Sequence, residues 1–377
     1  MQPSALTALH SLMHNHMFKS IHNIRKKKTF TKAGTVTMAA LALCVCFALT
    51  GCGKGSDNLK AAYECLNNLD YDGALASLAN AEEAGEDARQ IARARGIAYI
   101  GQADYVSASQ QFVIALQSGT GYPDAMDVDI NYYLAASYDC IGDYAAAEDR
   151  YNAIINYCDD TESYLLRASA RLKQGDFENA VSDFNVVISR NPDDYDTLIG
   201  IYEMLSAIGY REAGLEYIKN AIAGDSGKMT DSEKGRMYYY LGEYTQAAAL
   251  LESARNADSS VTSSLFLGRT YEAMGEYNYA ANVYESYIGS KGANSELYDQ
   301  LGLCRLKMGE YEAALEAFKA GIEADDGTFA KSLEYNMAVA YEYTADFETA
   351  RELIRAYLAK YPDDQDAARE LTFLETR

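Results

Sequence analysis

The chain has 377 residues, of which 49% are hydrophobic and only 4 are proline, and it carries 33 Lys and Arg against 55 Asp and Glu. This composition is typical of a folded and mostly helical protein, because interior proline breaks helices and disordered chains contain fewer hydrophobic residues. The net charge of −22 disfavours sequence-independent binding to nucleic acid, since phosphates and anionic lipid headgroups would both be repelled. Nucleic acid is therefore not an expected partner.

The first 51 residues differ in charge from the remainder. They hold six of the 33 basic residues and no acidic one. From residue 52 onward the chain therefore has 27 basic and 55 acidic residues, a net charge of −28. The basic run Arg25–Lys28 precedes the apolar stretch Ala33–Thr50, and this order is typical of an export signal. All four histidines also precede residue 52, so the chain without this segment has no imidazole for catalysis or for metal binding.

The apolar stretch ends in Leu49-Thr50-Gly51-Cys52, which resembles the lipobox of bacterial lipoproteins. The resemblance implies that residues 1–51 are a leader and signal peptide that is removed. It also implies that a lipid such as palmitate is attached to Cys52, which would hold the chain on the extracytoplasmic face of a bacterial cell membrane. Residues 52–57 would then be a short tether, reaching at most about 20 Å. The alternative is an uncleaved signal anchor, although the stretch is short for a bilayer of ~30 Å.

A tight turn recurs along the rest of the chain. Met308-Gly309-Glu310-Tyr311 is one copy, and helical spacing flanks it on both sides. The position aligned with Tyr311 falls at 71, 105, 144, 177, 211, 244, 277, 311 and 347, which gives a period near 34 residues. We find no run of alternating β-branched residues that would predict a strand.

A helix pair in every 34 residues resembles the tetratricopeptide repeat (TPR). The resemblance implies an all-α fold, a right-handed superhelical solenoid of about nine helix-turn-helix repeats over residues 58–362. Residues 363–377 have helical spacing and predict a C-terminal capping helix. Small residues such as Gly302 and Ala314 recur where the two helices of a repeat must approach closely, and a larger residue such as Phe318 follows four positions later. Predicted repeat starts lie near residues 55, 89, 128, 161, 195, 228, 261, 295 and 331.

One interval is longer than the others, at 39 residues between Tyr105 and Tyr144. The extra residues fall in Gln117–Asp129, a stretch rich in Gly and Asp. Clustered carboxylates suit calcium, but the EF-hand pattern is absent. The sequence favours a solvated loop that caps the next helix, and no metal site is predicted.

The sequence offers no recognisable catalytic site and no cofactor site. Glycines are spaced one turn per repeat rather than clustered after a strand, so they do not form a phosphate-binding loop. An enzyme would have to rely on acidic pairs such as Glu82-Glu83, which more often belong to solvated helix faces. We expect the cysteines after Cys52 to be unpaired. Cys140 and Cys158 share a repeat, but Cys140 ends its first helix near the turn and Cys158 lies at the far end of its second helix, roughly 20 Å away.

In TPR domains, partner segments usually lie in a concave groove lined by the first helices of the repeats. Aromatic and Arg side chains are typical anchors at such interfaces. Alternatively, many of the 32 Tyr residues serve packing only, as we expect of Tyr99, Tyr138, Tyr238, Tyr271 and Tyr341. Carried over by register, the resemblance points to Tyr63, Arg93, Ile97, Tyr132, Asp139, Leu165, Ser169, Lys173, Arg236, Tyr239, Tyr240, Arg269, Glu272, Tyr335 and Tyr343.

Together these patterns predict a membrane-anchored lipoprotein that binds protein or peptide partners through its concave surface, as an adaptor or assembly factor and not as an enzyme. A rigid structural spacer in envelope or secretion-complex assembly, with contacts made by its edges, is an alternative. A carboxylate-based hydrolase of cell-wall glycan is a further alternative. The identity of the partner, the oligomeric state, the type of envelope and the choice of Met1 or Met17 as the start remain open.

Overall fold

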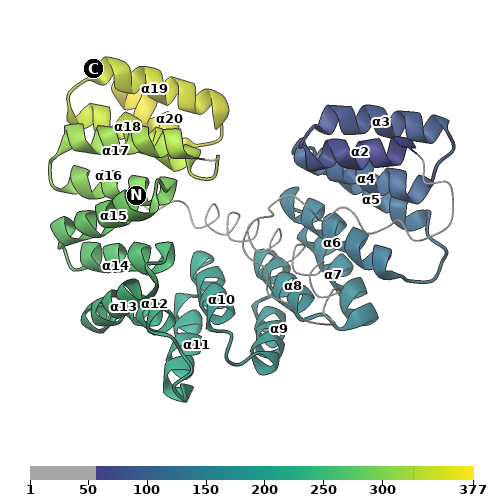
Figure 1. Cartoon of the computed structure of the whole chain (residues 1–377), viewed down its shortest axis with the longest axis horizontal. Helices are drawn as coiled ribbons and strands as arrows, with labels where there is room; N and C mark the ends of the chain where they lie inside the picture. The colour runs from purple at the N-terminus through teal and green to yellow at the C-terminus, as the bar shows by residue number, and fades with distance from the viewer. Residues whose placement is uncertain (1–56, 326) are drawn as a thin grey trace. The chain divides into compact units, whose positions relative to one another are not determined.

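The structure is a computed structural model that describes residues 57–325 and 327–377. These residues form nineteen helices and no strand, which confirms the predicted all-α class (Figure 1). The helices are α2 (Asp57–Asn67), α3 (Tyr71–Glu83), α4 (Ala88–Gly101), α5 (Tyr105–Gln117), α6 (Ala125–Cys140), α7 (Tyr144–Cys158), α8 (Thr161–Gln174), α9 (Phe177–Arg190), α10 (Tyr195–Ala207), α11 (Arg211–Gly224), α12 (Asp231–Leu241), α13 (Tyr244–Asp258), α14 (Val261–Ala273), α15 (Tyr277–Lys291), α16 (Ser295–Lys307), α17 (Tyr311–Ala324), α18 (Ala330–Tyr343), α19 (Phe347–Lys360) and α20 (Gln365–Leu374).

The helices are arranged as nine pairs followed by α20. Within residues 57–192, and likewise within residues 193–377, the first helix of each pair packs against the second, and the second packs against the first helix of the next pair, with a smaller contact between α11 and α12. The second helices begin at residues 71, 105, 144, 177, 211, 244, 277, 311 and 347, the residues that the recurring turn predicts. The predicted capping helix is α20, which packs on α19.

A left-handed residue ends the turn between the two helices of each pair. Glycine occupies it in six repeats, for example Gly175 with φ 82° and Gly309 with φ 76°. The other three repeats place Leu69, Ala103 and Ala345 there with φ 59°, 58° and 63°, although a Cβ makes this conformation costly by roughly 1–2 kcal/mol. The sequence motif therefore reflects a backbone requirement that persists where the glycine is missing.

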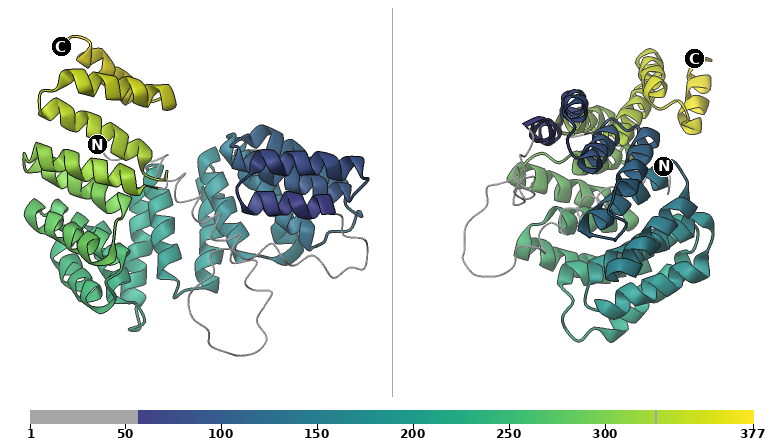
Figure 2. Two further views of the ribbon diagram at one scale, coloured as in Figure 1. Left: turned by 45° about the horizontal axis from the view of Figure 1, so that its top comes forward. Right: turned by 90° about the vertical axis from the view of Figure 1, so that its right-hand side faces the viewer.

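The described residues fall into two compact units, 57–192 and 193–377, and each is considered by itself. The first contains α2 to α9 and the second α10 to α20 (Figure 2). Pro192 follows α9, and Asp194 then caps α10 by accepting a hydrogen bond from the backbone N–H of Thr197. Pro362 follows α19 in the same way, and Asp364 caps α20. Each proline therefore follows the end of a second helix, and the aspartate two residues later caps the next helix.

The core of each repeat is built on close approach between small and large residues. Ala314 and Phe318 are fully buried, and an added Cβ at Gly302 would lie 2.4 Å from Cε1 of Phe318. The same arrangement places Gly268 against Tyr284 and Gly96 against Phe112. The packing roles predicted for these positions are therefore confirmed.

The long link differs in extent from the prediction. We expected a loop over Gln117–Asp129, but α5 includes Gln117 and α6 begins at Ala125, so Asp127 and Asp129 are helical. The reason is local, because Asp124 and Asp127 form a reciprocal capping box that starts the helix at this point. The predicted capping of the next helix is present, within a link of residues 118–124.

The described residues include no helix that is both long and apolar enough to span a bilayer. The predicted signal peptide, Cys52 and almost all of the tether lie outside the described residues. Of the cysteines within them, Cys304 is buried, Cys65 and Cys140 are half-buried and Cys158 is exposed, and all four are unpaired.

Candidate functional site

Successive first helices contact one another within each unit. The most extensive contacts between helices that are not consecutive join α2 to α4, α4 to α6, α10 to α12, α12 to α14 and α16 to α18. All of these are first helices, so the first helices lie closer together than the second helices do. We call the surface that they share the first-helix face, formed by α2, α4, α6 and α8 in residues 57–192 and by α10, α12, α14, α16 and α18 in residues 193–377.

In residues 57–192, Arg93 joins three first helices on this face. Its guanidinium donates to Oδ2 of Asp129 on α6 at 2.5 Å and to the hydroxyl of Tyr63 on α2 at 3.4 Å, and it lies over the ring of Tyr133. Burial alone would lower the pKa of Arg93, but the Asp129 carboxylate and the neighbouring tyrosines hold it above its usual value. Two predicted groove residues, Tyr63 and Arg93, are thus brought together in a bridge between repeats.

The carboxylates that could suggest a calcium loop are bound by arginines. Arg89 donates to Asp124 at 2.6 Å and pairs with Asp127, while Asp129 is bound by Arg93. In the part of the chain that the structure describes, no group of His, Cys, Asp or Glu side chains is arranged to hold a metal ion. These carboxylates therefore connect α4 to α6.

The other predicted residues of this unit are largely engaged inside the protein. Tyr132 is 4% exposed, and its hydroxyl donates to Asp160 at 2.5 Å. Lys173 donates to both oxygens of Asp139 at 2.9 Å. Leu165 and Ser169 are buried, and Ile97 packs against the core beside Phe112. These side chains position neighbouring first helices, so a partner would have to displace their contacts to use them.

In residues 193–377, aromatic rings gather on the first-helix face. Tyr240 lies 4.5 Å from Tyr202 and 5.7 Å from Phe266 between ring centroids, and Tyr239 meets Phe266 edge-on at 5.6 Å. The guanidinium carbons of Arg236 and Arg269 lie 5.2 and 5.7 Å from the Phe266 centroid. Four predicted groove residues thus surround one ring, and we call Tyr239, Tyr240, Phe266, Arg236 and Arg269 the aromatic-arginine cluster.

Carboxylates surround this cluster. Arg269 donates to Glu296 at 3.1 Å, and Glu272 accepts from the hydroxyl of Tyr284 at 2.5 Å. Asp299 is 4% exposed and accepts hydrogen bonds from Ser332 and from Asn336, the latter at 2.8 Å.

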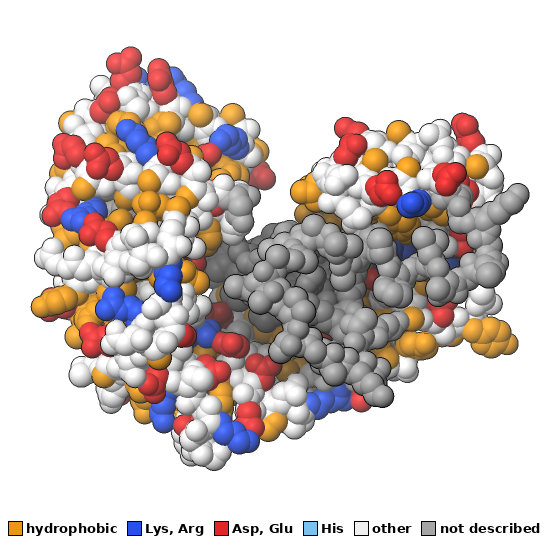
Figure 3. Space-filling model, viewed as in Figure 1, with side chains coloured by type: hydrophobic (Ala, Val, Ile, Leu, Met, Phe, Trp, Pro, Cys, Tyr) orange, Lys and Arg blue, Asp and Glu red, His pale blue; other side chains and the backbone are white. Residues whose placement is uncertain are grey.

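Burial raises the pKa of Glu272, Glu296 and Asp299, while Arg269 partly offsets this rise. These acids are consequently only partly neutralised by Arg269, the cation that they share. On the visible side of residues 193–377, acidic and basic side chains are interspersed with apolar ones (Figure 3).

The last two predicted groove residues lie apart from the aromatic-arginine cluster. Tyr335 meets Tyr357 of α19 at 5.7 Å between ring centroids. Tyr343, 57% exposed, stacks on Tyr311 at 5.3 Å, so it lies beside the start of α17. Tyr271, expected to serve packing, is half-buried and donates to Glu252.

Glu203, Glu296 and Phe266 belong to the site but were missed from the sequence. Glu203 accepts a hydrogen bond from Tyr240, and Phe266 forms the centre of the aromatic-arginine cluster. A signal for Glu203 exists in the spacing, because it precedes Arg236 by the same interval that separates Arg236 from Arg269. No comparable signal marks Phe266, since an aromatic residue at a core position usually only packs.

Family models described as tetratricopeptide repeat match residues 162–194, 232–296, 295–328 and 332–364. These segments coincide with the helix pairs α8–α9, α12–α13, α14–α15, α16–α17 and α18–α19. The comparison with curated proteins gives no match.

Several solved structures resemble the chain. A tetratricopeptide repeat protein from Parabacteroides merdae is 15% identical with a TM-score of 0.48, and the match covers 76% of this chain and 99% of that one. YrrB, described as a TPR protein with an unusual peptide-binding site, is 23% identical with a TM-score of 0.34, covering 50% and 96%. The human IFIT1 dimer with PPP-AAAA is 15% identical with a TM-score of 0.40, covering 84% and 85%. Likeness at these identities concerns the helical fold alone.

Proposed function

The chain carries tetratricopeptide repeats, and we propose that it is a scaffold that binds a protein or peptide partner at the first-helix face of residues 193–377. The observation that carries the proposal is the aromatic-arginine cluster, because Tyr and Arg side chains dominate the energetics of protein interfaces. Tyr239, Tyr240, Arg236 and Arg269 are all half-buried, so each keeps part of its surface available. No chemistry is assigned to this face.

The charges around the cluster favour a partner segment that carries Lys or Arg. Four carboxylates, those of Glu203, Glu272, Glu296 and Asp299, accompany two arginines on this face. Burial raises the pKa of Glu272, Glu296 and Asp299, and a cation brought close to their ionised forms would be attracted more strongly than at an open surface, because water screens buried charges less. Electrostatic complementarity of this kind mainly sets specificity and the rate of association.

We further propose that the scaffold is anchored to the extracytoplasmic face of a bacterial membrane by a lipid on Cys52. The support is the order of the basic run, the apolar stretch and the lipobox-like Leu49–Cys52. The two acyl chains of a diacylglyceryl group would hold the protein stably on the membrane, whereas a single chain would bind only marginally. The first helix pair of the adaptor or assembly factor would then lie close to the membrane, because α2 begins at Asp57.

Site-specific photo-crosslinking in cells tests the partner proposal. A crosslinking residue in place of Tyr239 should capture a polypeptide, whereas one in place of Tyr279, 59% exposed on the second helix α15, should not. Adding Arg236→Glu or Arg269→Glu should abolish capture at position 239. Lys219→Glu, an exposed cation on α11, is the matched control and should leave it intact. Capture at position 279 alone would contradict the proposal and favour a spacer that uses its edges.

Metabolic labelling with a fatty acid tests the anchor separately. Cys52→Ala should leave the precursor uncut and unlabelled, because the thiol is the acceptor of the lipid. Cys65→Ala removes a nearby thiol and should leave labelling unchanged. Normal labelling of the Cys52→Ala protein would overturn the anchor without affecting the partner proposal.

A further inference from the structure

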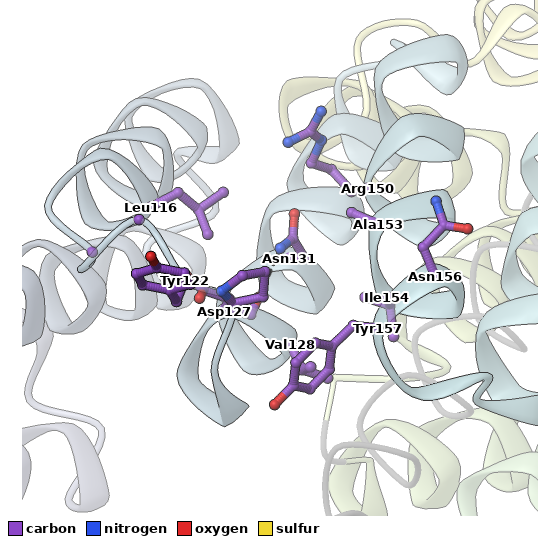
Figure 4. A pocket seen from close by; sticks show the side chains of 13 residues that line it. Leu116, Tyr122, Asp127, Val128, Asn131, Arg150, Ala153, Ile154, Asn156 and Tyr157 are labelled. Atoms are coloured by element: carbon purple, nitrogen blue, oxygen red, sulfur yellow. Dashed lines mark hydrogen bonds between the residues drawn. The ribbon is translucent and has the colours of Figure 1, made fainter.

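A cavity of about 440 Å³ lies beside the longest link between repeats, within residues 57–192 (Figure 4). The end of α5, the link 118–124, the first turns of α6 and the last turns of α7 line it, and it is open to solvent. Leu116, Ile154, Tyr122 and Tyr157 contribute apolar and aromatic surface. Tyr122 is 83% exposed and Tyr157 is 48% exposed, so both rings line the cavity and still have surface available to a ligand.

One wall of the cavity carries a buried acceptor without a donor. Asn131 is 8% exposed, and its Nδ2 donates to the backbone carbonyl of Asp127 at 2.8 Å. That bond fixes the amide orientation and leaves Oδ1 without a hydrogen-bond partner among the described residues. A buried acceptor left unsatisfied costs roughly 1–3 kcal/mol, so the position favours a ligand that brings a donor.

The cavity is also lined by a cation that the protein does not use. Arg150 of α7 makes no hydrogen bond or ion pair with any residue that the structure describes. Every other Lys and Arg of residues 57–192 forms an ion pair: Lys60, Arg89, Arg93, Arg95, Arg167, Arg171, Lys173 and Arg190. In a unit so rich in acids, an arginine without a carboxylate partner is available for an anion from outside.

We infer that this cavity binds an apolar amino-acid unit with a free carboxylate, either the last residue of a polypeptide or a free or N-acylated amino acid. The N–H of the unit would donate to Oδ1 of Asn131, and its carboxylate would accept from Arg150. The apolar side chain would lie against Leu116, Ile154 and the two tyrosine rings. Asp127, bound to Arg89 at the edge of the cavity, disfavours ligands with several negative charges.

The inference is independent of the proposed function. The cavity lies in residues 57–192 and does not include the aromatic-arginine cluster, which belongs to residues 193–377. The cavity lies where the interval between repeats is longest, because Tyr122 and the two glycines that line it, Gly119 and Gly121, come from the link 118–124. A second type of ligand would therefore bind this protein without any change at the aromatic-arginine cluster.

Isothermal titration of the purified protein with N-acetylleucine tests the inference, with N-acetylleucinamide as the matched ligand that lacks the charge. We expect saturable binding of the acid and at least tenfold weaker binding of the amide. Arg150→Gln should weaken binding of N-acetylleucine about tenfold and leave binding of N-acetylleucinamide unchanged. Asn131→Leu, which replaces the unsatisfied amide with an apolar group of similar size, should weaken both. Asp149→Asn, an exposed position next to Arg150, should change neither.

Two further ligands distinguish the sources of the unit. Tighter binding of a tripeptide that ends in leucine than of free leucine would indicate the end of a polypeptide, and the reverse order would indicate a free amino acid. Equal affinity for the acid and the amide would overturn the inference, as would wild-type affinity in both cavity variants. Circular dichroism of each variant separates lost binding from lost folding.

Discussion

Gly302 shows how one missing methyl group can hold two helices together. It sits on α16 where α17 approaches, and an added Cβ would meet the Phe318 ring at 2.4 to 2.7 Å. Phe318 is fully buried and belongs to the core shared with Leu333 of the next repeat. A shift of this ring would therefore disturb two repeats at once.

Gly302→Ala is expected to lower the free energy of unfolding by roughly 1–3 kcal/mol, the usual cost of overfilling a packed core. Gly289→Ala is the matched control, because Gly289 is exposed on α15 and an added Cβ there meets nothing within 4 Å. That change should raise the free energy of unfolding by roughly 0.5–1 kcal/mol, since Ala favours helix over Gly. Urea denaturation of both variants measures the difference, and equal effects would contradict the packing role.

At the scale of helices, the capping helix α20 is joined to α18 through two carboxyl groups. The carboxyl groups of Glu342 on α18 and Glu370 on α20 interact, and a proton on one of them would relieve the repulsion between the two charges. Burial, followed by the charge of Glu370, raises the pKa of Glu342 to about 7. Tyr335, Asp364 and Asp366 face the same region, where Asp364 pairs with Lys331 and Asp366 with Arg369.

A raised carboxyl pKa means that the folded chain binds the proton more tightly than the unfolded chain does. The stabilisation is complete below the unfolded value near 4.5 and is lost as the pH rises toward 7. Between pH 5 and pH 8, the free energy of unfolding of Glu342→Gln should therefore increase by about 1 kcal/mol relative to wild type. The increase is smaller than the full pKa shift implies, because solvent screens this half-buried group. Urea titrations at several pH values measure the gain, and Glu348→Gln, exposed on α19, should show none.

The helices could be predicted from sequence to the residue where the cause is local. Tyr144 and Tyr311 begin second helices because a left-handed residue and a capping position immediately precede them. Side-chain partners could not be predicted in this way, because they come from the neighbouring repeat. The register placed Arg93 and Tyr132 on a binding face, but it did not reveal that Asp129 and Asp160 already engage them.

The cavity beside the link 118–124 could not be predicted from the sequence either, here because its key residues lack partners. The sequence identified the lengthened interval and its glycines, but the significance of Asn131 and Arg150 depends on which partners they lack. Lack of a partner is a property of the folded unit and has no signature in a single sequence. The signal that could have directed attention there is the break in period itself.

At the scale of the whole molecule, the excess of acidic residues should make stability depend on salt. From residue 52 onward the net charge is −28, and like charges repel across a folded surface. Raising sodium chloride from 10 to 150 mM shortens the screening length from about 30 to about 8 Å. Tm should therefore rise by a few degrees in a thermal scan followed by circular dichroism. A fall in Tm would mean instead that attraction within the ion pairs outweighs the repulsion.

The left-handed turns have a consequence for the order in which the repeats open. The turns built on Leu69, Ala103 and Ala345 belong to the first, second and last helix pairs, whereas the six pairs between them use glycine. The costlier turns therefore lie at the end of the array that starts with α2 and at the end that closes with α20. Backbone amides of these pairs should exchange with deuterium faster than those of the other pairs. Each unit would then unfold first at the helix pairs nearest its own chain end.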